Sequence, residues 1–235
     1  SNYWIVFIEI EIETMMVPKN INGKKVGILG LGISGMSAAN SILAGGGEIF
    51  AYDDNHLNNK IDFTDPKNWP WNLLDQILVS PGIPLSHPVI KKARSLKIKI
   101  INEIDIFAQS LPKAKVIGVT GTNGKSSTTS LIGHIINYND INAEVGGNIG
   151  KAATSLNDPG SKGFIVLELS SFQLATCSQL KLDGGIILNI TPDHLDWHGN
   201  IKNYVNAKIR IASFLKAKAP LLISSNDNLS KKASE

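Results

Sequence analysis

Short apolar runs, each ending in a glycine-rich or polar turn, recur along the whole chain. They occupy residues 24–29, 48–52, 76–79, 97–101, 116–120, 164–169, 185–190 and 220–224. Between several of these runs the apolar positions follow a helical period, as at 131–136 and in a predicted helix over 201–216. Buried strands that alternate with helices are typical of a parallel sheet covered on both faces. The pattern therefore predicts an α/β fold.

A polar stretch at 111–115 divides these strands into two sets. A glycine-rich turn follows the first strand of each set, at 30–35 and at 121–126, and the second turn carries a lysine and a serine. We therefore predict a Rossmann-like parallel-sheet domain over 21–112 and an ATP-binding α/β domain of the phosphate-loop type over 113–235. The second domain is expected to be incomplete at its C-terminus, because a new strand begins near residue 220. Residues 1–20 fit neither domain and are interpreted as an extension or tag.

Composition narrows the class of protein without assigning a function. The chain has 235 residues, of which 43% are hydrophobic and 18% charged, with a formal net charge of +3. This charge is too small to indicate a nucleic-acid partner, and no apolar run reaches the roughly 18 residues that a membrane span needs. The single cysteine, Cys177, excludes an internal disulfide and fits a reducing compartment. We therefore expect a cytoplasmic protein without membrane insertion. A monomer is a separate expectation, which these observations do not test.

The segment Val116-Ile-Gly-Val-Thr-Gly-Thr-Asn-Gly-Lys-Ser-Ser-Thr128 carries the clearest chemical signal. In such a loop, backbone N–H groups surround nucleotide phosphates, a lysine reaches the terminal phosphates, and the next hydroxyl holds Mg²⁺. The predicted ATP-binding residues are Gly121, Thr122, Asn123, Gly124, Lys125, Ser126 and Ser127. The strict pattern has glycine where Val119 stands, so a strand-to-helix turn with a surface lysine is the alternative.

Two further strand ends carry unusual polar residues. Glu168 closes the apolar run at 164–169, and His194 lies in the stretch Thr191-Pro-Asp-His-Leu-Asp196. Ligands of open parallel sheets bind beyond the carboxyl ends of the strands, so these side chains are expected to meet the Lys125 loop in a magnesium–nucleotide site. Taken singly, His194 also fits a hydrogen-bonded loop histidine.

Lys208 lies within an apolar helical stripe formed by Tyr204, Ile211 and Leu215. One interpretation is that its stem follows the core while its ammonium reaches solvent. The other is a buried lysine of lowered pKa, able to react as a free amine and to be carbamylated by CO₂ into an anionic oxygen ligand.

The motif Gly30-Leu-Gly-Ile-Ser-Gly35, followed by Asp53, fits a dinucleotide-binding βαβ unit. Its glycines allow a pyrophosphate to approach the backbone, and the acid can accept a ribose hydroxyl. Ser80-Pro81-Gly82 is expected beside the same pocket. The motif alone does not distinguish NAD from a UDP-sugar, so an NAD-linked oxidoreductase remains an alternative function.

Seven motifs together resemble the Mur ligases over roughly residues 23–225. They are Gly30–Gly35, Ser80–Gly82, Gly121-Thr-Asn-Gly-Lys-Ser126, Gly146-Gly-Asn-Ile-Gly150, Glu168-Leu-Ser-Ser-Phe-Gln173, Asp193-His-Leu-Asp196 and Ala207-Lys-Ile-Arg210. The resemblance implies ATP-dependent addition of D-glutamate to UDP-N-acetylmuramoyl-L-alanine in peptidoglycan precursor synthesis. It also implies an acyl-phosphate intermediate and two Mg²⁺ ions.

The resemblance also assigns roles to individual residues. Lys125, Glu168, His194 and carbamylated Lys208 would form the catalytic set. Ser126 with Glu168 would hold the first Mg²⁺, and His194 with carbamylated Lys208 the second. The implied substrate-binding residues are Ile33, Ser34, Asp53, Ser80, Pro81, Gly82, Asn148, Ser170, Gln173 and His194.

The chain departs from the Mur ligase pattern at two points. Relatives often carry a basic residue after the acid at the uridine corner, whereas Asp54 and Asn55 follow Asp53 here. The family also has a third domain that supplies the amino-acid site, and this sequence stops before it. We therefore expect the chain alone to bind the UDP-sugar without forming the amide, and a non-catalytic nucleotide-binding fragment is a further alternative.

Overall fold

The computed structural model describes residues 15–55, 61–224 and 230. Most of the predicted extension lies outside these residues, but its last part does not behave as a tag. The Met16 side chain is 5% exposed, and its backbone N–H donates to the Thr154 carbonyl at 3.0 Å. The Lys19 N–H donates to the Gln109 carbonyl. Residues 16–19 are therefore anchored to the fold.

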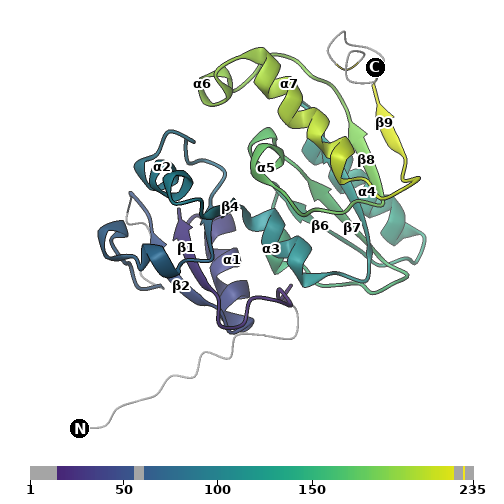
Figure 1. The fold of residues 1–235 in the computed structure, drawn as a ribbon. Coiled ribbons are helices and arrows are strands. Elements are labelled where there is room, and N and C mark those ends of the chain that lie inside the picture. Colours follow the sequence, from purple (N-terminus) through teal and green to yellow (C-terminus); the bar gives the residue numbers. More distant parts are fainter. Residues whose placement is uncertain (1–14, 56–60, 225–229, 231–235) are drawn as a thin grey trace.

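The first sheet has four parallel strands in the order β2-β1-β3-β4. Figure 1 shows this part of the chain, in purple and blue, beside the second sheet. The elements of this part are β1 (Lys25–Leu29), α1 (Ile33–Ala44), β2 (Glu48–Tyr52), β3 (Gln76–Val79), α2 (Pro88–Ser95), β4 (Lys99–Ile101) and α3 (Glu103–Ser110), with 3-10 turns at Pro66–Asn68 and Trp71–Leu73.

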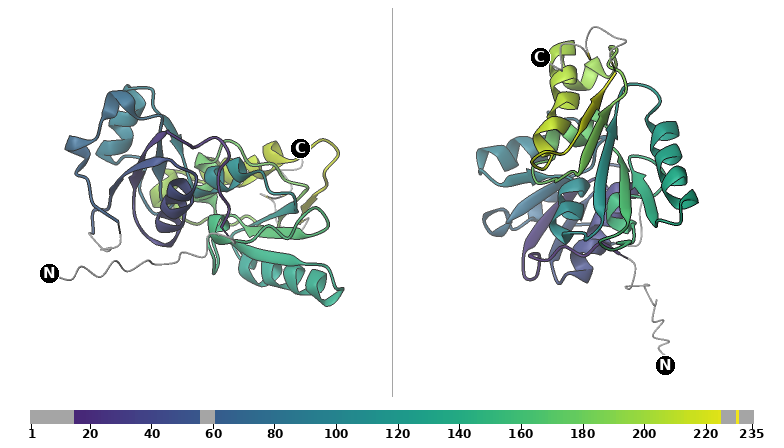
Figure 2. Two further views of the ribbon diagram at one scale, coloured as in Figure 1. Left: turned by 90° about the horizontal axis from the view of Figure 1, so that it is seen from below. Right: turned by 90° about the vertical axis from the view of Figure 1, so that its right-hand side faces the viewer.

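The second sheet has five parallel strands in the order β6-β7-β5-β8-β9. Its elements are β5 (Lys115–Thr120), α4 (Lys125–Tyr138), β6 (Ala143–Gly147), β7 (Phe164–Glu168), α5 (Ser171–Thr176), β8 (Gly184–Ile187), α6 (Leu195–His198), α7 (Ile201–Ile209) and β9 (Leu221–Ile223), with 3-10 segments at Ala153–Ser155 and Arg210–Phe214. Helix α4 covers one face of this sheet, and α5 and α7 cover the other (Figure 2).

These two sheets confirm the predicted α/β fold with parallel strands. Four details differ from the sequence pattern by two residues or more. Strand β6 was not predicted, β4 begins at Lys99 rather than at 97, β8 ends at Ile187 rather than at 190, and the helix predicted over 201–216 ends as α7 at Ile209. Among the described residues, no helix is long and apolar enough to cross a membrane.

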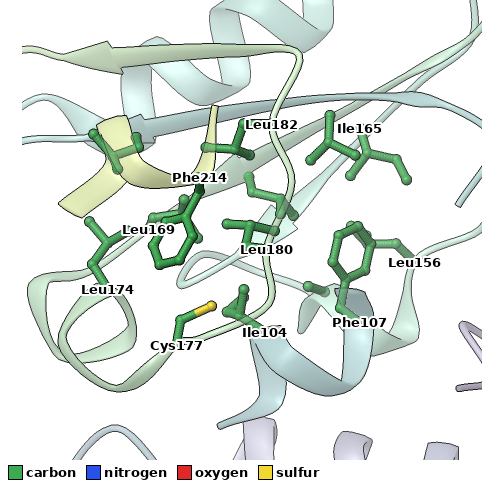
Figure 3. Close-up of a cluster of buried hydrophobic side chains, with 14 of the residues drawn as sticks. Ile104, Phe107, Leu156, Ile165, Leu169, Leu174, Cys177, Leu180, Leu182 and Phe214 are labelled. Carbon is green, nitrogen blue, oxygen red and sulfur yellow. The ribbon is translucent and has the colours of Figure 1, made fainter. Parts of the chain in front are cut away.

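Helix α3 joins the two sheets, because its opposite faces enter different cores. Ile104 and Phe107 belong to the buried cluster of the second sheet, which Figure 3 shows together with Leu169, Leu174 and Cys177. Ile106 instead packs into the core of the first sheet. The two cores therefore share one helix, and the ends of both sheets are held in a fixed relation.

Buried polar groups on α3 reinforce this junction. The Asp105 carboxylate accepts hydrogen bonds from the backbone N–H groups of Ser178 (2.7 Å) and Gln179 (2.9 Å), across 73 and 74 positions of sequence. Glu103 accepts the Thr154 N–H at 2.6 Å, and burial raises the pKa of its carboxyl to about 7. These buried hydrogen bonds favour one arrangement of α3 against the second sheet, because moving α3 away would leave the polar atoms unpaired.

Candidate functional site

The glycine loop between β5 and α4 forms the floor of the candidate site. Gly124 precedes the helix with φ +79°, a conformation that glycine adopts without the strain of a Cβ atom. Lys125 begins α4 and folds back, so that its Nζ donates to the Thr122 carbonyl at 2.9 Å. The N–H groups of the first helical turn have no acceptor within the helix, and they favour an anion at this end.

Glu168 ends the neighbouring strand β7 and is only 2% exposed. The Ser126 hydroxyl donates to its Oε2 at 2.6 Å, and the Asn148 side-chain amide donates to its Oε1 at 2.8 Å. Ser126, Glu168 and Asn148 come from three separate segments, and the structure brings them into direct contact. The result is a buried carboxylate beside the glycine loop.

Lys208 reaches the same loop from α7 and is 2% exposed. Its Nζ donates to the Gly121 carbonyl at 2.7 Å. Burial, and secondarily the nearby charge of Lys125, lowers the pKa of Lys208 to about 7, while Asp193 and Glu168 oppose this shift. The ammonium therefore does not reach solvent, and the interpretation as a buried lysine of lowered pKa is the one that fits the structure.

His194 takes a more peripheral position than the other three predicted catalytic residues. Its side chain is half exposed, its Nε2 is 3.5 Å from Asp193 Oδ2, and its ring lies 4.8 Å from the Phe172 ring between centroids. It has a left-handed backbone conformation, with φ +49°, at the start of α6. The structure thus brings Lys125, Glu168 and Lys208 together around the loop, with His194 at the rim.

Ser170 and Gln173, predicted to contact substrate, form the N-terminal cap of α5. The Ser170 Oγ accepts the Gln173 N–H at 3.2 Å, and the Gln173 Oε1 accepts the Ser170 N–H at 2.9 Å. Gln173 is 1% exposed, and its Nε2 has no hydrogen-bond partner. The reciprocal bonds stabilise the helix start, and the direct substrate contact remains a prediction.

The first glycine motif lies at the end of β1 and the start of α1. Asp53 Oδ2 accepts the Leu31 N–H at 2.6 Å, and its Oδ1 accepts the Asn55 N–H at 2.8 Å. The Ser80 hydroxyl donates to the Gly30 carbonyl at 2.8 Å. Asp53 and Ser80 therefore both shape the turn, and each Asp53 oxygen already accepts one backbone N–H group.

The remaining predicted residues of the first domain surround this turn. Ile33, at the start of α1, is 76% exposed, whereas Ser34 is partly buried. Pro81 is partly buried and Gly82 exposed in the loop after β3. The exposed Ile33 side chain, next to the glycine turn, offers an apolar contact surface for a ligand.

Comparison with known proteins identifies the family. Residues 119–235 match the family model described as the Mur ligase middle domain. The chain is also 40% identical, over 205 residues, to a UDP-N-acetylmuramoylalanine–D-glutamate ligase of Paramagnetospirillum magneticum. The chain belongs to the Mur ligase family.

Other relatives and solved structures agree with this assignment. Ligases of the same name from Wolbachia pipientis and Rhodopseudomonas palustris are 39% and 34% identical, with 80% and 94% of this chain covered. The match covers 45% of the Paramagnetospirillum ligase, 38% of the Wolbachia one and 50% of the Rhodopseudomonas one, so this Mur ligase chain spans about half the length of these relatives or less.

The fold comparison extends to more distant members. A Neisseria meningitides UDP-N-acetylmuramate:L-alanyl-gamma-D-glutamyl-meso-diaminopimelate ligase matches 90% of this chain and 74% of its own, with a TM-score of 0.61 at 15% identity. A Thermotoga maritima UDP-N-acetylmuramate-alanine ligase matches 89% of this chain and 51% of its own, with a TM-score of 0.53 at 22% identity. At these identities the likeness supports the fold.

Sequence reasoning missed two residues of this Mur ligase site. The Tyr204 hydroxyl lies 2.8 Å from the Thr122 hydroxyl, which connects α7 to the glycine loop one turn before Lys208. The Asn189 side chain makes three hydrogen bonds with the same loop. Tyr204 was recognised only as part of the apolar stripe, and Asn189 follows a strand as an ordinary polar loop residue would.

Substitution of Gly35 by alanine is expected to destabilise the first domain by about 3 kcal/mol or more and to abolish ligand binding at the glycine turn. A Cβ atom at Gly35 would lie 2.0 Å from the Gly30 carbonyl oxygen. Because this oxygen belongs to the backbone, the clash cannot be relieved by rotation of a side chain. Gly32→Ala is the matched control, since a Cβ there meets nothing within 4 Å. Chemical denaturation of both variants checks the prediction, and equal stabilities would contradict it.

Proposed function

We propose that this chain carries the UDP-sugar and ATP sites of a ligase that adds D-glutamate to UDP-N-acetylmuramoyl-L-alanine in peptidoglycan precursor synthesis. The observation that carries this proposal is the convergence of Lys125, Glu168 and buried Lys208 on one glycine loop. The amino-acid substrate rests on the names of the relatives. We further propose that the enzyme works as a monomer in the cytoplasm.

The two sheets divide the binding work in this proposal. The domain over 21–112 binds the uridine diphosphate at the turn shaped by Asp53 and Ser80, with Ile33, Ser34 and the Pro81–Gly82 loop beside it. The domain over 113–235 binds ATP. Asn148 and Gln173 of this domain face the muramoyl-alanyl part of the UDP-sugar substrate. The shared helix α3 supports this division, because it holds the two sites at a fixed separation.

The phosphates of ATP bind at the start of α4. When ATP binds, the Lys125 ammonium gives up its hydrogen bond to the Thr122 carbonyl and donates to phosphate oxygens instead. Its positive charge offsets the repulsion between the phosphates and the substrate carboxylate. The carboxylate oxygen attacks the γ-phosphorus and ADP leaves, which gives an acyl phosphate. The amine of D-glutamate then attacks the acyl carbon, loses a proton, and phosphate departs. Holding these anionic groups in line supplies most of the rate gain.

The residues present fit a magnesium ion beside the nucleotide. A buried carboxylate is costly without compensation, and the partners of Glu168 are neutral groups, Ser126 and Asn148. The described residues contain no cluster of three or more His, Cys, Asp or Glu side chains that could hold a metal ion alone. Glu168 and Ser126 would therefore hold the ion together with phosphate oxygens and water. When bound, the ion neutralises charge on the transferred phosphoryl group.

Lys208 is proposed to act as its carbamate. The neutral amine attacks CO₂, a C–N bond forms, and one proton is released, which leaves an anionic carboxylate on the side chain. The carbamate nitrogen keeps one N–H group, so the hydrogen bond to the Gly121 carbonyl can persist. The new carboxylate and His194 would then hold the second Mg²⁺.

An oxygen-isotope experiment tests the proposed reaction. The substrate is UDP-N-acetylmuramoyl-L-alanine labelled with ¹⁸O in its carboxylate, supplied with Mg-ATP and D-glutamate. Because the chain spans 45% of the Paramagnetospirillum ligase, the assay uses the chain and a fusion to the remainder of that relative. We expect the fusion protein to release phosphate that carries ¹⁸O. Amide formation without ¹⁸O in phosphate would rule out the acyl phosphate.

A further inference from the structure

Asn189 occupies a particular place relative to the phosphate loop. It lies two residues after the end of β8, the strand that pairs with β5 in parallel. The Leu188 N–H still donates to the Thr120 carbonyl at 3.0 Å, so the pairing continues to the last residue of β5. Asn189 is therefore the next residue after the β8–β5 pairing ends, and it lies beside the first residues of the glycine loop.

The Asn189 side chain binds two consecutive residues of that loop. Its Oδ1 accepts the N–H groups of Thr122 at 3.1 Å and Asn123 at 2.9 Å, and its Nδ2 donates to the Asn123 carbonyl at 3.0 Å. The Asn189 backbone carbonyl also accepts the Thr122 N–H at 2.9 Å. One side-chain amide thus serves as acceptor and donor for a dipeptide 66 positions away.

We infer that Asn189 is a positioning residue that holds the phosphate loop in its binding shape before nucleotide arrives. This inference rests on the proposed ATP site. It also assigns different partners to two groups of backbone N–H donors among the predicted loop residues. The N–H groups of Thr122 and Asn123 are engaged by Asn189, whereas the N–H groups from Lys125 to Ser127 begin a helix and have no intrahelical acceptor. Phosphate oxygens bind the second group, and Asn189 fixes the first.

An asparagine suits this role because the loop presents two donors and one acceptor. Aspartate would still accept the two N–H groups, but it would lose the bond to the Asn123 carbonyl and would place a negative charge beside the phosphates. Alanine would lose all three bonds. Lys208 and Tyr204 hold Gly121 and Thr122 independently, so the loop keeps other anchors when Asn189 is replaced.

Amide hydrogen exchange of the nucleotide-free chain tests the inference. In the unaltered chain, the Thr122 and Asn123 amides should be protected from exchange. Asn189→Ala should accelerate exchange of the Asn123 amide about tenfold, with no change at the β5 amides such as Val119. The Thr122 amide should change less, because its N–H keeps the 2.9 Å bond to the Asn189 backbone carbonyl. Exposed Asn206→Ala is the matched control and should leave both sets unchanged.

Nucleotide affinity provides the second readout. Asn189→Ala should weaken Mg-ATP binding about tenfold, and Asn189→Asp should weaken it further because of its charge. Unchanged protection of the Asn123 amide in Asn189→Ala would overturn the inference. Equal acceleration at Val119 would also overturn it, because it would indicate a general structural role. If the unaltered chain bound no Mg-ATP, the proposed function would fail, while the exchange pattern would still decide whether Asn189 holds the loop.

Discussion

The Lys125→Ala variant is expected to bind Mg-ATP about 100-fold more weakly than the unaltered chain. Lys125 begins α4 with its charge at the glycine loop, and its Nζ donates a hydrogen bond to the Thr122 carbonyl, three residues before it. Because that bond is a local one, its loss should not unfold the domain. Isothermal titration calorimetry with Mg-ATP measures the effect.

A matched variant separates local from general charge effects. Lys162 is exposed in the turn before β7, so Lys162→Ala removes the same charge far from the loop. It should leave the affinity for Mg-ATP within about twofold of the unaltered chain, since exposed charges are well screened at physiological salt. Equal affinity of Lys125→Ala and Lys162→Ala would mean that the glycine loop is not a phosphate site.

Replacement of Lys208 by methionine is expected to abolish ligation by the fusion protein described above, because no carbamate can form. The same replacement should remove a carbonyl ¹³C signal that the unaltered chain acquires from ¹³C-labelled CO₂. With the pKa of Lys208 lowered to about 7, the amine is largely neutral at pH 8 and largely protonated at pH 6. The signal should therefore fall as the pH drops from 8 to 6, and a signal that survives in Lys208→Met would disprove the assignment.

The lowered pKa of Lys208 also predicts how the stability of the folded chain depends on pH in buffer free of CO₂. The folded chain releases the Lys208 proton near pH 7, whereas an unfolded lysine keeps it until about pH 10.4. Between these values the unfolded state binds more protons, so the unaltered chain should gain stability relative to Lys208→Met as the pH rises. The gain should be on the order of 3 kcal/mol. Urea denaturation of both proteins at pH 7 and pH 10 measures it, and a constant difference would contradict the buried amine.

The fold was largely predictable because buried parallel strands read as short apolar runs. All strands except β6 were found in this way. Strand β6, Ala143–Gly147, lies at the sheet edge and ends in two glycines, so it lacks the β-branched run that marks a central strand. Helix α7 was predicted too long because residues 210–214 continue the helical course as a 3-10 segment, before Leu215 forms a bridge with Leu182. The apolar period does not distinguish the 3-10 segment from an α-helix.

The site was predictable where a charged residue stands within an apolar sequence pattern. Glu168 ends an apolar strand and Lys208 interrupts an apolar stripe, and both prove to be buried at the loop. Ser170 and Gln173 carry a capping-box spacing that was visible in the sequence and was not used. Asn189 gave no such signal. Its role depends on the pairing of β8 with β5, which only the folded sheet shows.

The central claim is that this chain binds a UDP-sugar at its first glycine turn. Calorimetric titration of the 235-residue chain with UDP-N-acetylmuramoyl-L-alanine, beside a titration with NADH, tests it most directly. We expect one molecule of the UDP-sugar to bind, with no binding to Gly35→Ala and no heat from NADH. Binding of NADH without binding of the UDP-sugar would contradict the account and would favour a dehydrogenase-like domain.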